Sequence, residues 1–172
     1  MHVARPRTSR GFTLVELLIV VVILGILAAI AIPQFANSTR DAQVTSLQTN
    51  LNVLRSSVEN YKFQHASRYP GYPAGGGSPD PAVFVAQLTQ ASKSDGSTAA
   101  LGTTGFDFGP YLKEALPVNP VNGLSTVKLL DDSTAFPTAA DGATGWIFKP
   151  LTGKLRANSI GTTASGTAYF DF

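Results

Sequence analysis

Residues 12–32, FTLVELLIVVVILGILAAIAI, form an apolar run of 21 residues with a single charged side chain, Glu16. As a helix with a rise of about 1.5 Å per residue, the run is roughly 31 Å long, which matches the hydrocarbon core of a bilayer. An unpaired carboxylate inside such a segment costs on the order of a few kcal/mol in lipid. The run is therefore predicted to span a membrane as a helix, and Glu16 is predicted to need a partner.

Two other interpretations of the apolar run remain open at this point. One is a membrane anchor with no further role. The other is an ordinary secretory signal peptide, because a small-x-small site, Ala29-Ile30-Ala31, ends the run and a basic segment precedes it with Arg5, Arg7 and Arg10. Against a signal peptide, the apolar stretch exceeds the usual length of about 7 to 15 residues and contains a charge.

The charge of the chain argues against a nucleic-acid ligand. The formal net charge is +2, with 13 basic and 11 acidic residues. Three of these basic residues lie within residues 1–11, so removal of that segment would leave 10 basic against 11 acidic side chains. No basic surface is then expected to bind phosphates. The same arginines predict that the N-terminal flank stays in the cytoplasm and that the rest of the chain lies outside the inner membrane.

The helical pattern continues after Pro33 as an amphipathic stripe. Apolar residues recur there at spacings of three and four, namely Val44, Leu47, Leu51, Leu54, Val58 and Tyr61. This spacing is typical of one buried helix face. One helix over residues 12–64 is therefore predicted. Pro33 removes a backbone hydrogen bond and predicts a bend or a locally melted turn, and a break into two helices is the alternative.

Residues 65–172, which we call the head, are predicted to cover this stripe with a small antiparallel sheet. Loops are expected at 66–81 and 92–105, a short helix at 82–91, and a helical turn beginning at Pro110. The strand candidates are 126–130, 146–149, 154–157 and 167–170, the middle two joined as a hairpin by Pro150-Leu151-Thr152-Gly153. The expected fold class is α+β, with one long N-terminal helix and a small head.

The residues Arg10-Gly11-Phe12-Thr13-Leu14-Val15-Glu16-Leu17-Leu18 resemble the processing site of type IV prepilins and of type II secretion pseudopilins. The resemblance implies a pilin-like fold and cleavage after Gly11 by a prepilin peptidase, which also methylates the new N-terminus at Phe12. It implies further that Glu16 pairs with the N-terminus of a neighbouring subunit in a filament. The expected division is a leader at 1–11, a membrane or filament-core segment at 12–32, an amphipathic helix at 33–64, and the head.

The segment 109–123 is similar to the Leu-Pro, Asp-Pro-Trp-Gly region of the major, G-type pseudopilins, although Asn119 replaces the aspartate and Val121 the tryptophan. This similarity and the absence of cysteine favour a secretion pseudopilin that assembles in the periplasm. Its implied partners are copies of itself, minor pseudopilins and the inner-membrane assembly platform, with membrane lipid around the helix before assembly. The alternative is a surface type IV pilin for adhesion, motility or DNA uptake, and a third interpretation is a secreted binding module.

The sequence offers little material for catalysis. Outside the leader there is one histidine, His65, and no cysteine, so a catalytic triad is not expected. G-type pseudopilins are known as calcium binders in a C-terminal loop, which the resemblance extends to Asp131, Asp132 and Asp141 as possible calcium ligands. The simpler interpretation is that these aspartates are solvated turn residues.

Overall fold

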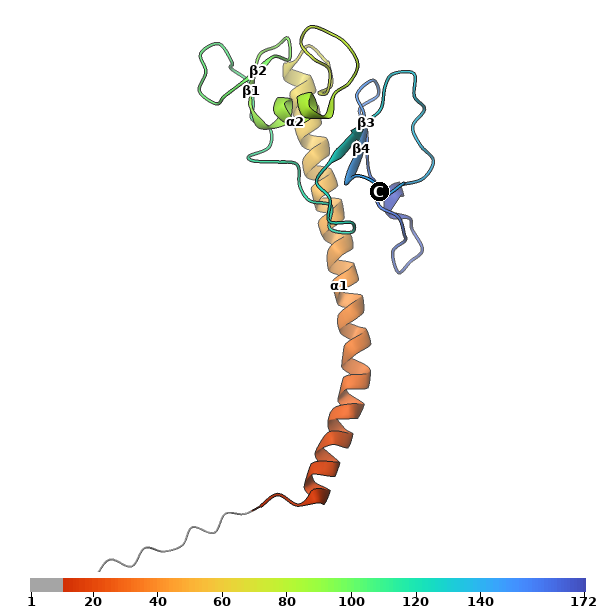
Figure 1. The fold of residues 1–172 in the computed structure, drawn as a ribbon. Helices are drawn as coiled ribbons and strands as arrows, with labels where there is room; N and C mark the ends of the chain where they lie inside the picture. Colours follow the sequence, from red (N-terminus) through yellow and green to blue (C-terminus); the bar gives the residue numbers. More distant parts are fainter. Residues whose placement is uncertain (1–10) are drawn as a thin grey trace, which may run out of the picture. The chain divides into compact units, whose positions relative to one another are not determined.

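The computed structural model describes residues 11–172, so that of the predicted leader only Gly11 is described. The elements are α1 (Leu14–Gln64), α2 (Pro81–Thr89), β1 (Ala91–Ser92), β2 (Thr98–Ala99), β3 (Val127–Leu129), β4 (Trp146–Lys149), β5 (Lys154–Ala157) and a 3₁₀ helix, η1 (Tyr169–Asp171) (Figure 1). The chain divides into two compact units, Met1–Arg40 and Asp41–Phe172. The α+β fold class predicted from the sequence is confirmed.

Helix α1 has nearly the predicted bounds and continues through Pro33 without interruption, so the alternative of two separate helices is wrong. The bend at Pro33 stays a prediction. The helix ends where Ala66 and Ser67 adopt positive φ angles of 51° and 63°. There the Ser67 N–H donates to the Lys62 carbonyl at 3.1 Å, which satisfies one of the last free carbonyls of the helix.

The amphipathic part of α1 supplies one side of the core of the C-terminal unit. Of the predicted stripe, Val44 is only half-buried. The other five residues are each at most 2% exposed and cluster with residues of the head such as Phe84, Trp146 and Phe148; they are Leu47, Leu51, Leu54, Val58 and Tyr61. Figure 1 shows α2 and the sheet beside this part of the helix. The stripe thus packs as predicted.

The sheet of the head has the order β3-β4-β5, and its central strand β4 contributes side chains to both hydrophobic clusters. Trp146 and Phe148 lie in the cluster against α1, whereas Ile147 lies in a second cluster with Leu130 and Phe170. This alternation follows the two-residue period of a strand. The predicted β4–β5 hairpin is present, with Trp146 opposite Ala157 and Lys149 opposite Lys154. Gly153 in its turn has φ +71°, and an added Cβ would overlap the Tyr69 ring.

The predicted antiparallel sheet is a mixed one: β4 pairs with β5 antiparallel as predicted, but β3 pairs with β4 in parallel, Val127 opposite Trp146. Residues 130–145 are long enough for the crossover that a parallel pair needs. The predicted strand at 167–170 is a 3₁₀ helix instead. Phe170 is the buried residue of this 3₁₀ helix, and its side chains do not alternate between buried and exposed as those of a strand would.

Two further predictions about the head differ from the structure. The expected loop at 92–105 contains the two-residue strand β2, which pairs with β1, Ala91 opposite Ala99. No helical turn follows Pro110, because the N–H groups of Tyr111 and Leu112 both donate to the Leu88 carbonyl at the end of α2, at 2.9 and 2.8 Å. A long-range contact therefore takes the donors that a local turn would have used.

Arg55 is predicted to stabilise the C-terminal unit, although its position off the apolar stripe gave no sign of this. Its Nη2 donates to the backbone oxygens of Leu155 at 3.1 Å and Phe172 at 2.7 Å. Burial first, and the charge of Arg156 second, lower the pKa of Arg55. Arg55→Met should lower the free energy of unfolding by about 1–2 kcal/mol, since it removes charged hydrogen bonds but keeps an apolar stem. Thermal unfolding measures this, and Arg68→Met, at an exposed arginine, is the control; equal losses would contradict the prediction.

Candidate functional site

The N-terminus of α1 is closed by a pair of polar residues, Thr13 and Glu16. The Glu16 carboxylate accepts from the Thr13 N–H at 2.8 Å and from the Thr13 hydroxyl at 2.7 Å. The Glu16 N–H donates in turn to Thr13 Oγ1 at 3.2 Å. This is a capping box, in which both residues satisfy free donors of the first helical turn. The sequence analysis missed the role of Thr13, although the Thr-x-x-Glu spacing before an apolar run is its signature.

Beyond this cap, α1 presents an apolar surface that nothing in the described chain covers. Residues Leu14–Ile32 have a mean hydropathy of 3.1, and no part of the most apolar window is buried. Most of their large side chains are about half exposed or more, from Leu14 at 81% to Val20 at 47%. By length and composition this is a segment that fits a bilayer. The same surface would equally suit burial among other apolar helices.

Gly11 and Phe12 lie just before the capping box. Phe12 is 77% exposed, and a Cβ added to Gly11 would meet no atom within 4 Å. The described contacts of the chain therefore give no packing reason for glycine at position 11.

The described structure does not bring together the three aspartates predicted as possible calcium ligands, and calcium binding itself stays a prediction. Within residues 11–172, no group of three or more His, Cys, Asp or Glu side chains is placed to hold a metal ion. Asp132 accepts a hydrogen bond from the Tyr72 hydroxyl. Asp141 pairs with Lys128 at 2.8 Å. That ammonium, together with hydrogen bonds from Asn158 and the Ala143 N–H, holds the pKa of Asp141 well below its usual range.

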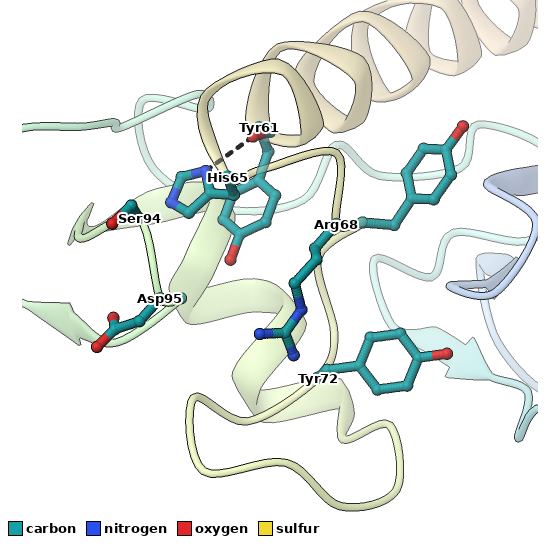
Figure 2. Close-up of a pocket in the computed structure, with 8 residues that line it drawn as sticks. Tyr61, His65, Arg68, Tyr72, Ser94 and Asp95 are labelled. Carbon is teal, nitrogen blue, oxygen red and sulfur yellow. Dashed lines mark hydrogen bonds between the residues drawn. The ribbon is translucent and has the colours of Figure 1, made fainter.

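His65 lies at the end of α1, where it is buried and forms a hydrogen bond with the side chain of Ser92. Its Nδ1 lies 2.7 Å from the Tyr61 carbonyl, which requires Nδ1 to donate, and its Nε2 lies 3.1 Å from Ser92 Oγ. The ring stacks on Tyr61 with centroids 3.7 Å apart (Figure 2). Both His65 and Ser92 are at most 1% exposed, and the group behind the histidine is a carbonyl instead of a carboxylate. A substrate could not reach the buried serine, so the pair is not a catalytic site. Its hydrogen bond joins α1 to β1.

The pocket beside His65 is also too small for an organic ligand. It lies among Tyr61, Arg68, Tyr72, Ser94 and Asp95 (Figure 2), and its volume is about 10 Å³. A cavity of this size holds about one water molecule. The pocket therefore offers no binding site for a substrate.

The buried histidine predicts that the C-terminal unit loses stability in mild acid. Burial lowers the pKa of His65, partly offset by hydrogen bonds to the backbone of Tyr61 and Lys93. The unfolded chain, with an ordinary histidine pKa near 6.5, then binds more protons than the folded chain as the pH falls below that value. The melting temperature should drop between pH 7 and pH 5, and should drop less in His65→Gln. An equal pH dependence in the two proteins would exclude His65 as the cause.

Comparison with known proteins identifies the N-terminal segment. Residues 6–32 match the family model described as the prokaryotic N-terminal methylation motif. A fimbrial protein of Pseudomonas aeruginosa is 48% identical over 54 residues, which cover 31% of this chain and 35% of the relative. The type IV major pilin protein PilA of Myxococcus xanthus is 45% identical over 74 residues, covering 42% and 33%. The type II secretion system core protein G of P. aeruginosa is 39% identical over 64 residues, covering 37% and 44%.

The matched part spans about a third of the length of several of these curated relatives, such as 35% of the fimbrial protein. No solved structure matches the chain at a significant level. Pilins and pseudopilins are structural subunits and not enzymes, in agreement with the sequence analysis. Through its methylation motif and its N-terminal helix, the chain is similar to type IV pilin-like proteins, which include both pilins and type II secretion pseudopilins.

Proposed function

We propose that this chain is a structural subunit of a pilus-like filament. The observation that carries the proposal is the uncovered apolar helix Leu14–Ile32, with its one carboxylate at Glu16. Such a helix is stable only where lipid or other apolar helices surround it. A membrane before assembly and a bundle of identical helices after assembly supply these two environments in turn.

In this proposal the chain is cut after Gly11 and methylated at Phe12 by a prepilin peptidase. The methylation motif at residues 6–32 supports the processing. The parts of the chain are then a leader at 1–11, a membrane and filament-core segment at 12–32, an amphipathic helix at 33–64 and the head. Before assembly the N-terminus faces the cytoplasm and the head faces the periplasm.

Two kinds of filament remain as candidates. A periplasmic type II secretion filament is supported by the similarity to core protein G and by the segment Leu116-Pro117 through Pro120 to Gly123 in a chain without cysteine. Its partners would include minor pseudopilins and the inner-membrane assembly platform. A surface type IV pilus is supported by the higher identity to the fimbrial and pilin relatives, 48% and 45% against 39%.

The deciding experiment is the intact mass and N-terminal residue of the protein recovered from cell membranes. A chain that begins at N-methylated Phe12 is the expected result. A soluble chain that begins at Ile32 would mean an ordinary exported protein, and an uncut chain in the membrane would mean a simple anchor. Deletion of the gene, followed by a secretion assay and by electron microscopy of the cell surface, then separates the secretion filament from the surface pilus.

A further inference from the structure

Three asparagines join the C-terminal loops of the head from inside. Asn119 and Asn158 are completely buried. Asn119 Nδ2 donates to the Gly145 carbonyl and to Ser159 Oγ, both at 2.8 Å. Asn122 Nδ2 donates to the carbonyls of Thr144 at 2.9 Å and Asn158 at 3.0 Å. We call Asn119, Asn122 and Asn158 the asparagine clamp, because they tie together segments 117–124, 141–145 and 158–159.

Asn158 is the member of the clamp that holds the loop around Asp141. Its Oδ1 accepts from the N–H groups of Asp141 at 3.0 Å and Gly142 at 3.3 Å. Its Nδ2 donates to Asp141 Oδ1 at 2.5 Å and to Thr144 Oγ1 at 2.9 Å. The side chain thus makes four hydrogen bonds, two as acceptor and two as donor, and only an amide can make all of them.

A calcium ion does not fit this arrangement of donors. Calcium takes six to eight oxygen ligands, with carboxylates prominent among them. Here Asp141 supplies the carboxylate, and both of its oxygens are engaged, Oδ2 by Lys128 at 2.8 Å and Oδ1 by Asn158 Nδ2 and the Ala143 N–H. The side chains of Asn119 and Asn122 donate N–H groups to loop carbonyl oxygens at 144, 145 and 158, which a cation would need as ligands. The positive charge at this place is the ammonium of Lys128.

We propose that the asparagine clamp and the Lys128–Asp141 ion pair hold the C-terminal loops in the way that a divalent cation otherwise would, so that the head folds independently of calcium. Asn119 stands where the G-type pattern has aspartate, and an amide at that position donates hydrogen bonds that a carboxylate cannot. The inference concerns the folding of the head and does not depend on the proposed function.

Thermal unfolding of the full chain in detergent micelles tests the proposal. The fluorescence of Trp146, the single tryptophan, reports on the clamp directly, because Trp146 is fully buried and its Nε1 donates to the Pro117 carbonyl at 2.9 Å. The melting temperatures in millimolar calcium and in excess chelator should agree within about 1 °C. Calcium at about a hundredfold above its dissociation constant would raise the melting temperature by several degrees, and that result would overturn the proposal.

A charge substitution in the clamp gives an independent test. Asn158→Asp places a second carboxylate oxygen against Asp141 Oδ1 and should lower the melting temperature by about 5 °C or more. Asn60→Asp adds the same charge at an exposed position on α1 and should change it by about 1 °C at most. Equal stability of the two variants would show that the clamp does not hold the loops.

If Asn158→Asp does not fold, the ion pair supplies a milder comparison. Lys128→Met removes the positive charge beside Asp141, whereas Lys113→Met removes one from an exposed loop position. Because the pair is about half exposed, the expected difference in melting temperature is about 2–4 °C. No difference between these variants would exclude Lys128 from the role of the cation.

Discussion

A chain that carries Glu16→Ala is expected to be cut after Gly11 as efficiently as the wild type, yet to yield filaments at about a tenth of the wild-type amount or less. In the proposed filament, the carboxylate of Glu16 pairs with the charged N-terminus of Phe12 in a neighbouring subunit. A buried charge that loses its partner costs about 3–5 kcal/mol. A tenfold loss corresponds to about 1.4 kcal/mol, so the expected effect is easily large enough to observe.

The capping box explains how Glu16 is tolerated before assembly. In the single chain, the carboxylate is held by the N–H and the hydroxyl of Thr13 at 2.8 and 2.7 Å. These hydrogen bonds reduce the cost of a carboxylate at the membrane, where unpaired polar groups are unfavourable. Assembly would then exchange a hydroxyl for an ammonium as the partner of Glu16. This exchange gives the bound state a charge-assisted contact that the single chain lacks.

The assembly experiment needs a control that loses the same charge elsewhere. Glu114→Ala serves, because Glu114 is an exposed residue of the head. Filaments are sheared from cells or collected after overproduction, and the cleaved subunit in the membrane is measured by its mass. Normal filaments from Glu16→Ala would refute the pairing. Loss of cleavage would instead assign Glu16 to recognition by the peptidase.

The sequence predicted the parts of this molecule whose signals are local. The apolar run, the Pro33 position within one helix and the buried stripe from Leu47 to Tyr61 follow from periodicity along a single element. The β4–β5 hairpin was equally predictable, since its turn residues and strand residues are neighbours in the sequence. The structure buries the stripe residues and most of the β4 side chains that these patterns select, whereas the apolar run is exposed in the single chain.

The sequence was least informative where distant residues compete for the same groups. The N–H groups of Tyr111 and Leu112 donate to the Leu88 carbonyl and therefore do not form the local turn that the sequence predicts. β3 pairs with β4 in parallel because of a crossover that no local pattern encodes. Asp141 bonds to Lys128 and Asn158, which lie 13 and 17 residues away, so no local pattern indicated these contacts. No local pattern indicated the long-range hydrogen bonds of Asn119, Asn122 and Asn158 either.

The largest loss of stability is expected from Phe148→Ala in the central strand. Phe148 is completely buried, lies between Leu129 of β3 and Leu155 of β5, and packs on Phe84 with ring centroids 5.1 Å apart. Removing a buried aromatic ring costs about 3–5 kcal/mol through lost burial and the cavity that remains. Domains of this size have about 5–15 kcal/mol in total. The melting temperature of the full chain should therefore fall by about 10 °C or more.

Phe63→Ala is the matched control for this change, because the same ring is removed from a position that is 89% exposed. It lies on α1, where alanine is also the better helix former. The expected change is within about 0.5 kcal/mol. Far-ultraviolet circular dichroism and the fluorescence of Trp146 record both unfolding curves in the same micelles. If Phe63→Ala lowered the melting temperature as much as Phe148→Ala, the core of the C-terminal unit would not be the one that joins the α1 stripe to β4.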